Sequence, residues 1–311
     1  YITSAQELHS MSFEKFAHQF MQVVDELSDC TDMEEKGFFH EYRDSDPIPS
    51  SKVLEEVIEL CRTIFFPGYY GKPSINHATL PYNMGVNVER LYTLLLQQIA
   101  AGICFGGSHT DCSRVYRLAE DICCRIITRL PEIRSTLETD VIAAYDGDPA
   151  AVSYGEVISC YPVIKALINY RIAHELHKME VPLIPRIISE QAHSETGIDI
   201  HPGAEIGRYF TIDHGTGVVI GATCIIGNHV KLYQGVTLGA KSFPLDKDGN
   251  PIKGIARHPI IEDDVIIYSN ATVLGRITIG KGATIGGNIW VTEDVPAGAR
   301  IVQYRKQESK T

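Results

Sequence analysis

Apolar residues in roughly the first two-thirds of the chain recur every three or four positions, the spacing of one face of an α-helix. Three runs show this spacing: Val53, Val57 and Leu60; Leu91, Leu94, Leu95 and Ile99; and Leu118, Ile122 and Ile126. A helical period reports a buried face and nothing about chemistry. Residues 1–197 are therefore predicted to form an α-helical domain that serves packing and assembly.

Proline and glycine suggest where some of these helices begin and end. Pro131 suits the first turn of a new helix that runs toward Tyr145 and is interrupted at Gly147. Two further helices are expected, one from Pro162 to His177 and one from Pro185 toward His193.

Beyond Gly197 the pattern changes, because aliphatic residues now recur every six positions. Thirteen positions follow this period in three runs: Ile200, Ile206 and Ile212; Ile220, Ile226, Leu232 and Leu238; and Ile261, Ile267, Val273, Ile279, Ile285 and Val291. Such a period is typical of a solenoid of short parallel strands. Three hexapeptides would close one triangular coil, with the aliphatic side chains stacked inside and small residues at the corners.

The sequence thus predicts an α+β protein in which the N-terminal α-helical domain is followed by a parallel β-helix, a hexapeptide-repeat solenoid, over residues 198–294. Residues 295–311 would form a C-terminal tail. Each coil of a solenoid covers only its neighbours, so the ends need caps, and the helical domain can cap one of them. A length of 311 residues also favours two domains over one core.

The six-residue period breaks twice. Two extra residues are inserted around 213–217, and the chain makes a long excursion over residues 241–259. A regular scaffold departs from its own rule mainly at functional sites. Both breaks carry a histidine beside a charged residue, Asp213-His214 in the first and Arg257-His258 in the second.

His214 is the first candidate for catalysis, because histidine is the usual general base near neutral pH. Such a base needs a carboxylate to fix its tautomer. Asp199 lies fifteen residues upstream, which in a coil of about eighteen residues is roughly one coil away. Spacing alone leaves open whether the two residues form a dyad.

Arg257 is a candidate clamp for a substrate carboxylate, since its planar fork matches two oxygens. A solvated loop arginine is the alternative interpretation. His201 and His229 also fall in the repeat region, and we interpret both as polar groups at coil corners.

Composition narrows the class of protein. The formal net charge of −11 gives the chain no general attraction to nucleic acid. No run approaches the ~20 apolar residues of a membrane span. The eight cysteines include no C-x-x-C pair, which favours reduced thiols in a cytoplasmic protein over a disulfide frame or a zinc site.

Several motifs in order and at their expected spacing resemble the serine O-acetyltransferases, which are hexapeptide-repeat acyltransferases. The resemblance covers about Asp148 to Val291 and goes well beyond a generic repeat. Its motifs are Asp148-Pro149-Ala150, Tyr170-Arg171-Ile172-Ala173-His174, Asp199-Ile200-His201-Pro202, Ile206-Gly207, Asp213-His214-Gly215-Thr216-Gly217, Gln234-Gly235-Val236-Thr237-Leu238-Gly239 and Arg257-His258-Pro259.

The resemblance implies a left-handed β-helix that transfers acetyl from acetyl-CoA to L-serine, giving O-acetylserine, the precursor of cysteine. His214 would take the proton from the serine hydroxyl, and Asp199 would orient His214. Arg257 would bind the serine carboxylate. Asp148 and Asp213 would bind the ammonium group of serine. His258 would lie near the reacting hydroxyl. No metal and no permanently bound cofactor are expected.

Acetyl-CoA would lie along a groove between adjacent coils, at a boundary between subunits. By position, the small residues that would line this groove are Gly239, Ala240, Ser269 and Gly287. Tyr268 and Ser269 depart from the glycine or alanine that is common in the family at several of these positions. The solenoid implies a homotrimer, and two trimers could meet through the helical domain.

Two partners follow from the same resemblance. L-cysteine is expected to compete with serine as a feedback inhibitor. Many family members end in an isoleucine that docks into O-acetylserine sulfhydrylase, whereas this chain ends at Lys310-Thr311, which argues against that complex here.

Three other functions remain as alternatives. The first is an acyltransferase of the same fold that acts on a sugar or another amino acid, although Arg257 with Asp148 and Asp213 favours an amino acid. The second is a γ-type carbonic anhydrase that would bind zinc through His201, His214 and His229, in which the Asp-His-Gly-Thr-Gly and Arg-His-Pro motifs would have no role. The third is a non-catalytic assembly protein.

Overall fold

The computed structural model describes residues 5–41, 47–71, 75–105, 111–242 and 244–303, with side chains described for all of these except 5–15 and 112. The chain divides into two compact units, residues 1–46 and residues 47–311. The first unit holds the helices α1 (Ala5–Ser28) and α2 (Thr31–Glu35). The predicted boundary at 197/198 falls inside the second unit, between a helix and a strand.

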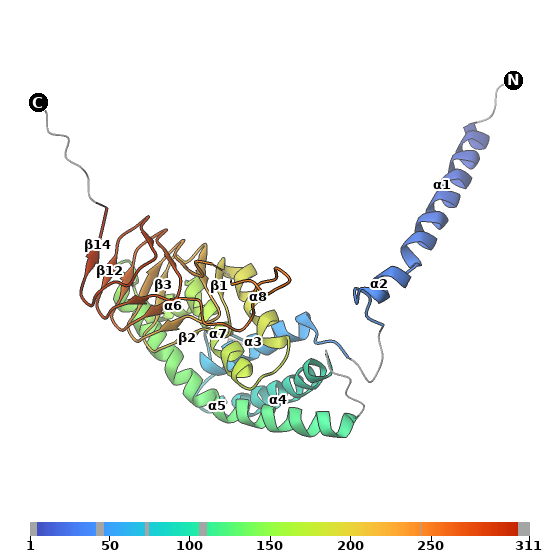
Figure 1. Cartoon of the computed structure of the whole chain (residues 1–311). Coiled ribbons are helices and arrows are strands. Elements are labelled where there is room, and N and C mark those ends of the chain that lie inside the picture. The colour runs from blue at the N-terminus through green and yellow to red at the C-terminus, as the bar shows by residue number, and fades with distance from the viewer. Residues whose placement is uncertain (1–4, 42–46, 72–74, 106–110, 243, 304–311) are drawn as a thin grey trace, which may run out of the picture. The chain divides into compact units, whose positions relative to one another are not determined.

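The second unit begins with helices, as predicted (Figure 1). They are α3 (Ser51–Phe65), α4 (Leu80–Cys104), α5 (Cys112–Gly147), α6 (Tyr154–Cys160), α7 (Pro162–Lys178) and α8 (Ile184–Thr196). Side-chain caps start several of them: the Ser50 hydroxyl accepts the Val53 N–H in α3, and the Asp111 carboxylate accepts two N–H groups at the start of α5. Gly197 ends α8 in the left-handed conformation, at φ 70°, and leads into the first strand.

The prediction that Pro131 starts a helix is wrong, because α5 runs through it unbroken. Proline in a helix interior removes one hydrogen bond and costs about 3 kcal/mol. The buried face of α5 continues on both sides of Pro131, with Ile126 and Leu130 before it and Ile133 and Leu137 after it. Burial of this continuous apolar face offsets the local cost, so the helix does not break.

A parallel β-helix of short strands follows the helices, as predicted (Figure 1). Its strands form three sheets, ordered β1-β4-β7-β10-β13, β11-β8-β5-β2 and β14-β12-β9-β6-β3, and every strand pair is parallel. All thirteen aliphatic residues of the six-residue period are buried inside the coils. The strands are β1 (Ile198–Ile200), β2 (Glu205–Ile206), β3 (Thr211–Asp213), β4 (Val218–Ile220), β5 (Ile225–Ile226), β6 (Lys231–Tyr233), β7 (Thr237–Gly239), β8 (Ile260–Ile261), β9 (Ile266–Ile267), β10 (Thr272–Leu274), β11 (Thr278–Ile279), β12 (Thr284–Ile285), β13 (Trp290–Val291) and β14 (Arg300–Ile301).

Both breaks in the period appear as departures from a uniform coil. Ile198 of β1 pairs with Val218 of β4, an offset of 20 residues, whereas Val219 of β4 pairs with Thr237 of β7, an offset of 18. The extra two residues therefore widen the first coil only. The excursion lies between β7 and β8, and its described part contains an antiparallel bridge between Leu245 and Pro251.

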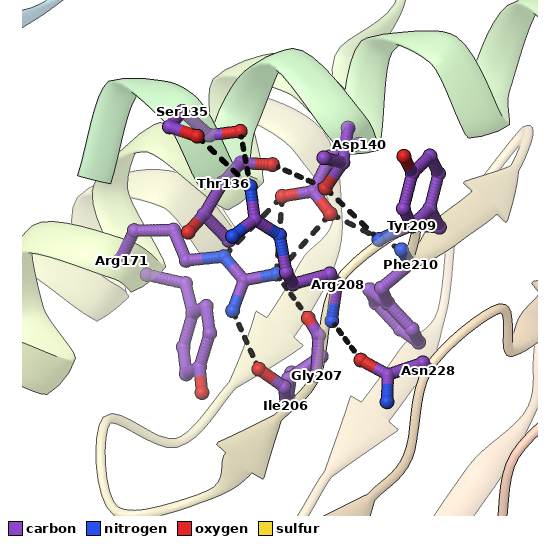
Figure 2. Close-up of polar contacts among 12 residues, drawn as sticks. Ser135, Thr136, Asp140, Arg171, Ile206, Gly207, Arg208, Tyr209, Phe210 and Asn228 are labelled. Carbon is purple, nitrogen blue, oxygen red and sulfur yellow. Dashed lines mark hydrogen bonds and ion pairs between the residues drawn. The ribbon is translucent and has the colours of Figure 1, made fainter. Parts of the chain in front are cut away.

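Helices α5 and α7 are bonded to the first coil through a buried ion pair (Figure 2). The Arg171 guanidinium of α7 donates to both carboxylate oxygens of Asp140 of α5, and also to the carbonyl oxygens of Ile206 at 2.6 Å and Gly207 at 2.7 Å. Asp140 in turn accepts the backbone N–H of Phe210 at 3.1 Å. These contacts fix the direction of α5 relative to the coil, and so the place where α5 ends.

Candidate functional site

The first candidate group lies at the turn from β3 to β4, residues 213–217, which we call the His214 corner. His214 itself adopts the left-handed conformation, at φ 59°, and 76% of its side chain is exposed. Gly215 follows at φ 95°, a conformation that favours glycine, and a Cβ atom there would also lie 2.5 Å from the end of the Ile198 side chain. The two-residue insertion therefore turns the His214 imidazole outward into solvent.

Two carboxylates from distant parts of the chain line one small cleft beside this corner. Asp213 ends β3, and Asp148 is the residue that follows the last turn of α5. An Asp213 oxygen lies 3.8 Å from Nε2 of His214. The sequence predicted both carboxylates as ammonium ligands, and α5 brings Asp148 to the corner that carries Asp213.

Asp148 is held by hydrogen bonds that stabilise its charged form. One oxygen accepts the Tyr161 hydroxyl at 2.5 Å, and the other accepts the Ala150 N–H at 2.8 Å. The Tyr161 hydrogen bond is the largest influence that keeps the pKa of Asp148 below its ordinary value, and the charges of Lys231 and His214 act in the same direction. The same hydrogen bond raises the pKa of Tyr161 to about 12, so Tyr161 remains a donor.

The second candidate group lies at the turn that leads into β8, which we call the His258 corner. His258 is only 7% exposed. The Thr223 hydroxyl oxygen accepts the backbone N–H of Arg257 at 2.9 Å and that of His258 at 3.1 Å. Gly221 permits this arrangement, because a Cβ atom there would lie 2.0 Å from the His258 ring.

The contacts of His258 determine its tautomer. Its Nδ1 accepts the backbone N–H of Thr223 at 3.1 Å and lies 2.8 Å from the Thr223 hydroxyl, so Nδ1 carries no proton. Burial is the main influence that lowers the pKa of His258, and Arg257 and Arg276 lower it further. The neutral ring therefore carries its proton on Nε2 and can donate a hydrogen bond from there.

Asp199 lies in the middle of β1, where its neighbours Ile198 and Ile200 are buried and its own side chain alternates to the outer face. Its partner on the next coil is Val219. In the part of the chain that the structure describes, no hydrogen bond or ion pair links Asp199 to His214. The dyad stays a prediction.

The four residues predicted to bind acetyl-CoA divide between the two corners. Ser269 and Gly287 lie after β9 and β12, on turns stacked below the His214 corner, and a Cβ atom on Gly287 would lie 3.2 Å from the Ser269 carbonyl oxygen. Gly239 and Ala240 lie at the end of β7, where the chain leaves toward the His258 corner. The predicted CoA-binding residues of one chain thus lie at two separate corners of the β-helix.

Sequence reasoning missed Tyr161 and Lys231, which complete the cleft around Asp148 and Asp213. Lys231 of β6 pairs in register with Thr211 of β3. The two inserted residues make the first coil 20 residues long, so Lys231 aligns with Thr211 and lies diagonally across from Asp213. Counting 18 residues per coil hides this neighbour. Tyr161 carries no comparable signal, because its position depends on how α6 and α7 pack.

The three histidines of the zinc alternative lie at three different corners. His201 follows β1, His214 follows β3, and His229 precedes β6 and stacks on the Tyr209 ring with centroids 4.4 Å apart. Within the described residues, no group of three or more histidine, cysteine, aspartate or glutamate side chains could hold a metal ion. Likewise, no helix described here is long and apolar enough to cross a membrane.

Comparisons with known proteins agree on one family. No family model matches the chain. A plasmid-encoded serine acetyltransferase of Synechococcus elongatus is 49% identical over 262 residues, which cover 83% of this chain and 82% of that protein. The crystal structure of Entamoeba histolytica serine acetyltransferase 1 in complex with L-cysteine is 36% identical, with a TM-score of 0.71 over 85% of this chain and 91% of that one. Soybean serine acetyltransferase complexed with serine is 29% identical, with a TM-score of 0.52 over 82% and 96% of the two chains.

Proposed function

This chain belongs to the serine acetyltransferase family, and we propose that it transfers the acetyl group of acetyl-CoA to the hydroxyl of L-serine. The products are O-acetylserine and free CoA. The observation that carries the proposal is the meeting of Asp148 with Asp213 and His214 beside one corner of the β-helix. Two carboxylates next to a histidine suit a substrate that carries an ammonium group beside a hydroxyl, and a sugar offers no such cation.

His214 acts as the general base of this reaction. As the serine oxygen attacks the thioester carbonyl carbon, His214 takes the hydroxyl proton. A free serine alkoxide therefore does not have to form before the attack. The C–S bond then breaks, and the proton on His214 can pass to the departing sulfur. The outward direction of the imidazole, beside Asp213 and the Asp148 cleft, supports this role. Asp199 orients His214 in the assembled site.

Arg257 and His258 hold the other end of the substrate. Arg257 binds the serine carboxylate through its planar guanidinium. His258 donates its Nε2 proton to the substrate near the reacting oxygen, a role supported by its buried, neutral form. Burial thus gives the two histidines different roles, His214 as a base and His258 as a fixed donor.

A homotrimer assembles the complete site. The base His214 and the two carboxylates that bind the ammonium group belong to the His214 corner in the first coil. The carboxylate clamp Arg257 belongs to the His258 corner, which is a different corner of the triangular β-helix and lies two coils further along. Packing the His214 corner of one subunit against the His258 corner of the next brings both halves together. The same boundary places Ser269 and Gly287 of one subunit opposite Gly239 and Ala240 of its neighbour, with acetyl-CoA between them.

L-cysteine inhibits by competing with L-serine. The two amino acids share the ammonium and carboxylate groups, and a thiol replaces the hydroxyl, so both clamps can engage cysteine. Support comes from the Entamoeba histolytica relative, whose structure contains L-cysteine.

The test is a CoA-release assay with acetyl-CoA and a panel of L-serine, L-homoserine and sugars. We expect release that depends on L-serine and decreases when L-cysteine is added. Release that is independent of serine, or that is faster with a sugar, would refute the proposal. Sedimentation of the same preparation tests the trimer, and a species of monomer mass at assay concentration would contradict it.

A further inference from the structure

Lys231 is a largely buried lysine in the first two coils that the proposed mechanism does not use. It begins β6, where the next residue, Leu232, points into the coil. The Lys231 side chain is therefore on the outer face, yet only 16% of it is exposed. A lysine on the outside of a solenoid usually extends into solvent, so this burial requires specific contacts.

Those contacts join the two segments that carry the carboxylates of the His214 corner. Lys231 Nζ lies 3.2 Å from an Asp213 oxygen, which it reaches diagonally from its register partner Thr211. It also donates to the carbonyl oxygen of Gly147 at 2.6 Å. Gly147 is the last residue of α5 and immediately precedes Asp148. One ammonium group thus connects the strand that carries Asp213 with the helix end that carries Asp148.

The surroundings hold Lys231 in place and charged. Its Nζ lies 4.5 Å from the centre of the Tyr233 ring, and Tyr233 stacks on Tyr268 with centroids 4.9 Å apart. A cation at the C-terminal end of α5 is also stabilised by the helix dipole. Burial alone would lower the pKa of Lys231, but contacts with Tyr233 and Asp213 raise it above the ordinary value.

We propose that Lys231 is a positioning residue that holds Asp148 and Asp213 at the separation that receives the substrate ammonium group. This proposal rests on the proposed function. In this proposal Lys231 acts through Asp213 and the end of α5, and takes no part in the acetyl transfer itself. It bonds to one Asp213 oxygen, while the other oxygen lies toward His214. Its loss should therefore weaken serine binding, with little change in the chemical step or in acetyl-CoA binding.

The experiment compares Lys231→Met and Lys231→Arg with the full-length wild type. Lys231→Met keeps the apolar stem and removes the charge, and we expect the KM for L-serine to rise about tenfold, equivalent to ~1.4 kcal/mol. The KM for acetyl-CoA and kcat should stay within about twofold of wild type. Lys231→Arg, which keeps a cation within reach of Asp213, should restore most of the serine affinity.

A matched control separates positioning from general stabilisation. Lys165 of α7 also pairs with a carboxylate, Glu195, at 2.5 Å, but lies away from the cleft. Lys165→Met should leave both KM values unchanged. Thermal unfolding of all variants shows whether the fold is intact. If Lys231→Met cannot be purified, Lys231→Gln serves instead, because it removes the charge but keeps a hydrogen-bond donor. We expect the serine KM to rise in Lys231→Gln as well, but by less than about tenfold.

The outcomes distinguish this proposal from the proposed function. A wild-type protein without serine-dependent CoA release would refute the function itself. With an active wild type, an unchanged serine KM in Lys231→Met would overturn the positioning role. So would an equal rise in both KM values, because that pattern indicates a general loss of structure. Calorimetric titration of L-serine without acetyl-CoA should show the same loss of affinity.

Discussion

The two corners of the β-helix hold their histidines in opposite ways. His214 is mostly exposed and lies in the first coil, which the helices cover, whereas His258 is buried two coils further along and is held by Thr223. An exposed imidazole can take and release a proton, while a buried one that accepts through Nδ1 is fixed as a neutral donor. The proposed difference in role between the two histidines therefore rests on burial together with the contacts from Thr223.

The largest expected effect comes from removing the exposed histidine. His214→Ala should lower kcat about 10³-fold, within the range for loss of a general base. His214 lies outside the hydrophobic core of its own chain, so thermal stability should not change, and we expect assembly to be retained. Steady-state kinetics and sedimentation test both statements, and a kcat within tenfold of wild type would show that His214 is not the base.

Loosening the helices from the first coil should lower the free energy of unfolding. Arg171→Met leaves the fully buried Asp140 without its partner, which typically costs about 3–5 kcal/mol. Chemical denaturation measures this loss. Arg134→Met, which removes an exposed pair with Glu138, is the control and should cost less than about 1 kcal/mol. Equal losses in the two variants would mean that the buried pair does not hold the helices to the coil.

The His258 corner can be tested by changing the residue that fixes its tautomer. Thr223→Val keeps the shape but removes the hydroxyl that bonds to His258 Nδ1 and accepts two backbone N–H groups. We expect about a tenfold loss in kcat/KM for serine, ~1.4 kcal/mol. NMR shifts of the His258 ring nitrogens should report a less uniform tautomer. Unchanged ring shifts would contradict the role assigned to Thr223.

A smaller effect is expected at the Asp148 carboxylate. Tyr161→Phe removes one hydrogen bond of 2.5 Å but leaves the Ala150 N–H in place. The KM for serine should rise about threefold, in line with a hydrogen bond of ~0.7 kcal/mol. Because the Tyr161 hydroxyl lowers the pKa of Asp148, the acidic limb of kcat/KM should also move to higher pH. A pH profile identical to that of wild type would exclude this coupling.

The smallest effect concerns His201, which lies at the corner of the first coil, above His258. Burial, followed by the charges of Arg186 and His177, lowers the pKa of His201 to about 4. The unfolded chain binds a proton at this residue below about pH 6.5, so stability should decrease as the pH falls from ~6.5 toward 4. Denaturation of His201→Gln across this range should show a shallower decrease than wild type. Equal slopes would mean that His201 does not contribute.

The β-helix could be predicted from the sequence because its period reports burial directly. All thirteen aliphatic residues lie inside the coil, and both interruptions mark the corners that carry the candidate histidines. The prediction that Pro131 starts a helix was wrong because it used only the local preference of proline for a first helical turn. The long buried face of α5 keeps the helix continuous through that residue. Lys231, Thr223 and Tyr161 were missed because their roles depend on contacts between segments far apart in the sequence.

The bonding of Arg171 to the first coil has a consequence for how the protein folds. A coil is stabilised by the neighbour that it covers, and helices α5 and α7 provide the first coil with such a neighbour. We therefore expect winding to begin at β1 and to proceed toward β14, with each coil serving as the template for the next. The wider first coil would then set the register that every later turn inherits, so the active-site corner would form early and the more distant His258 corner afterwards.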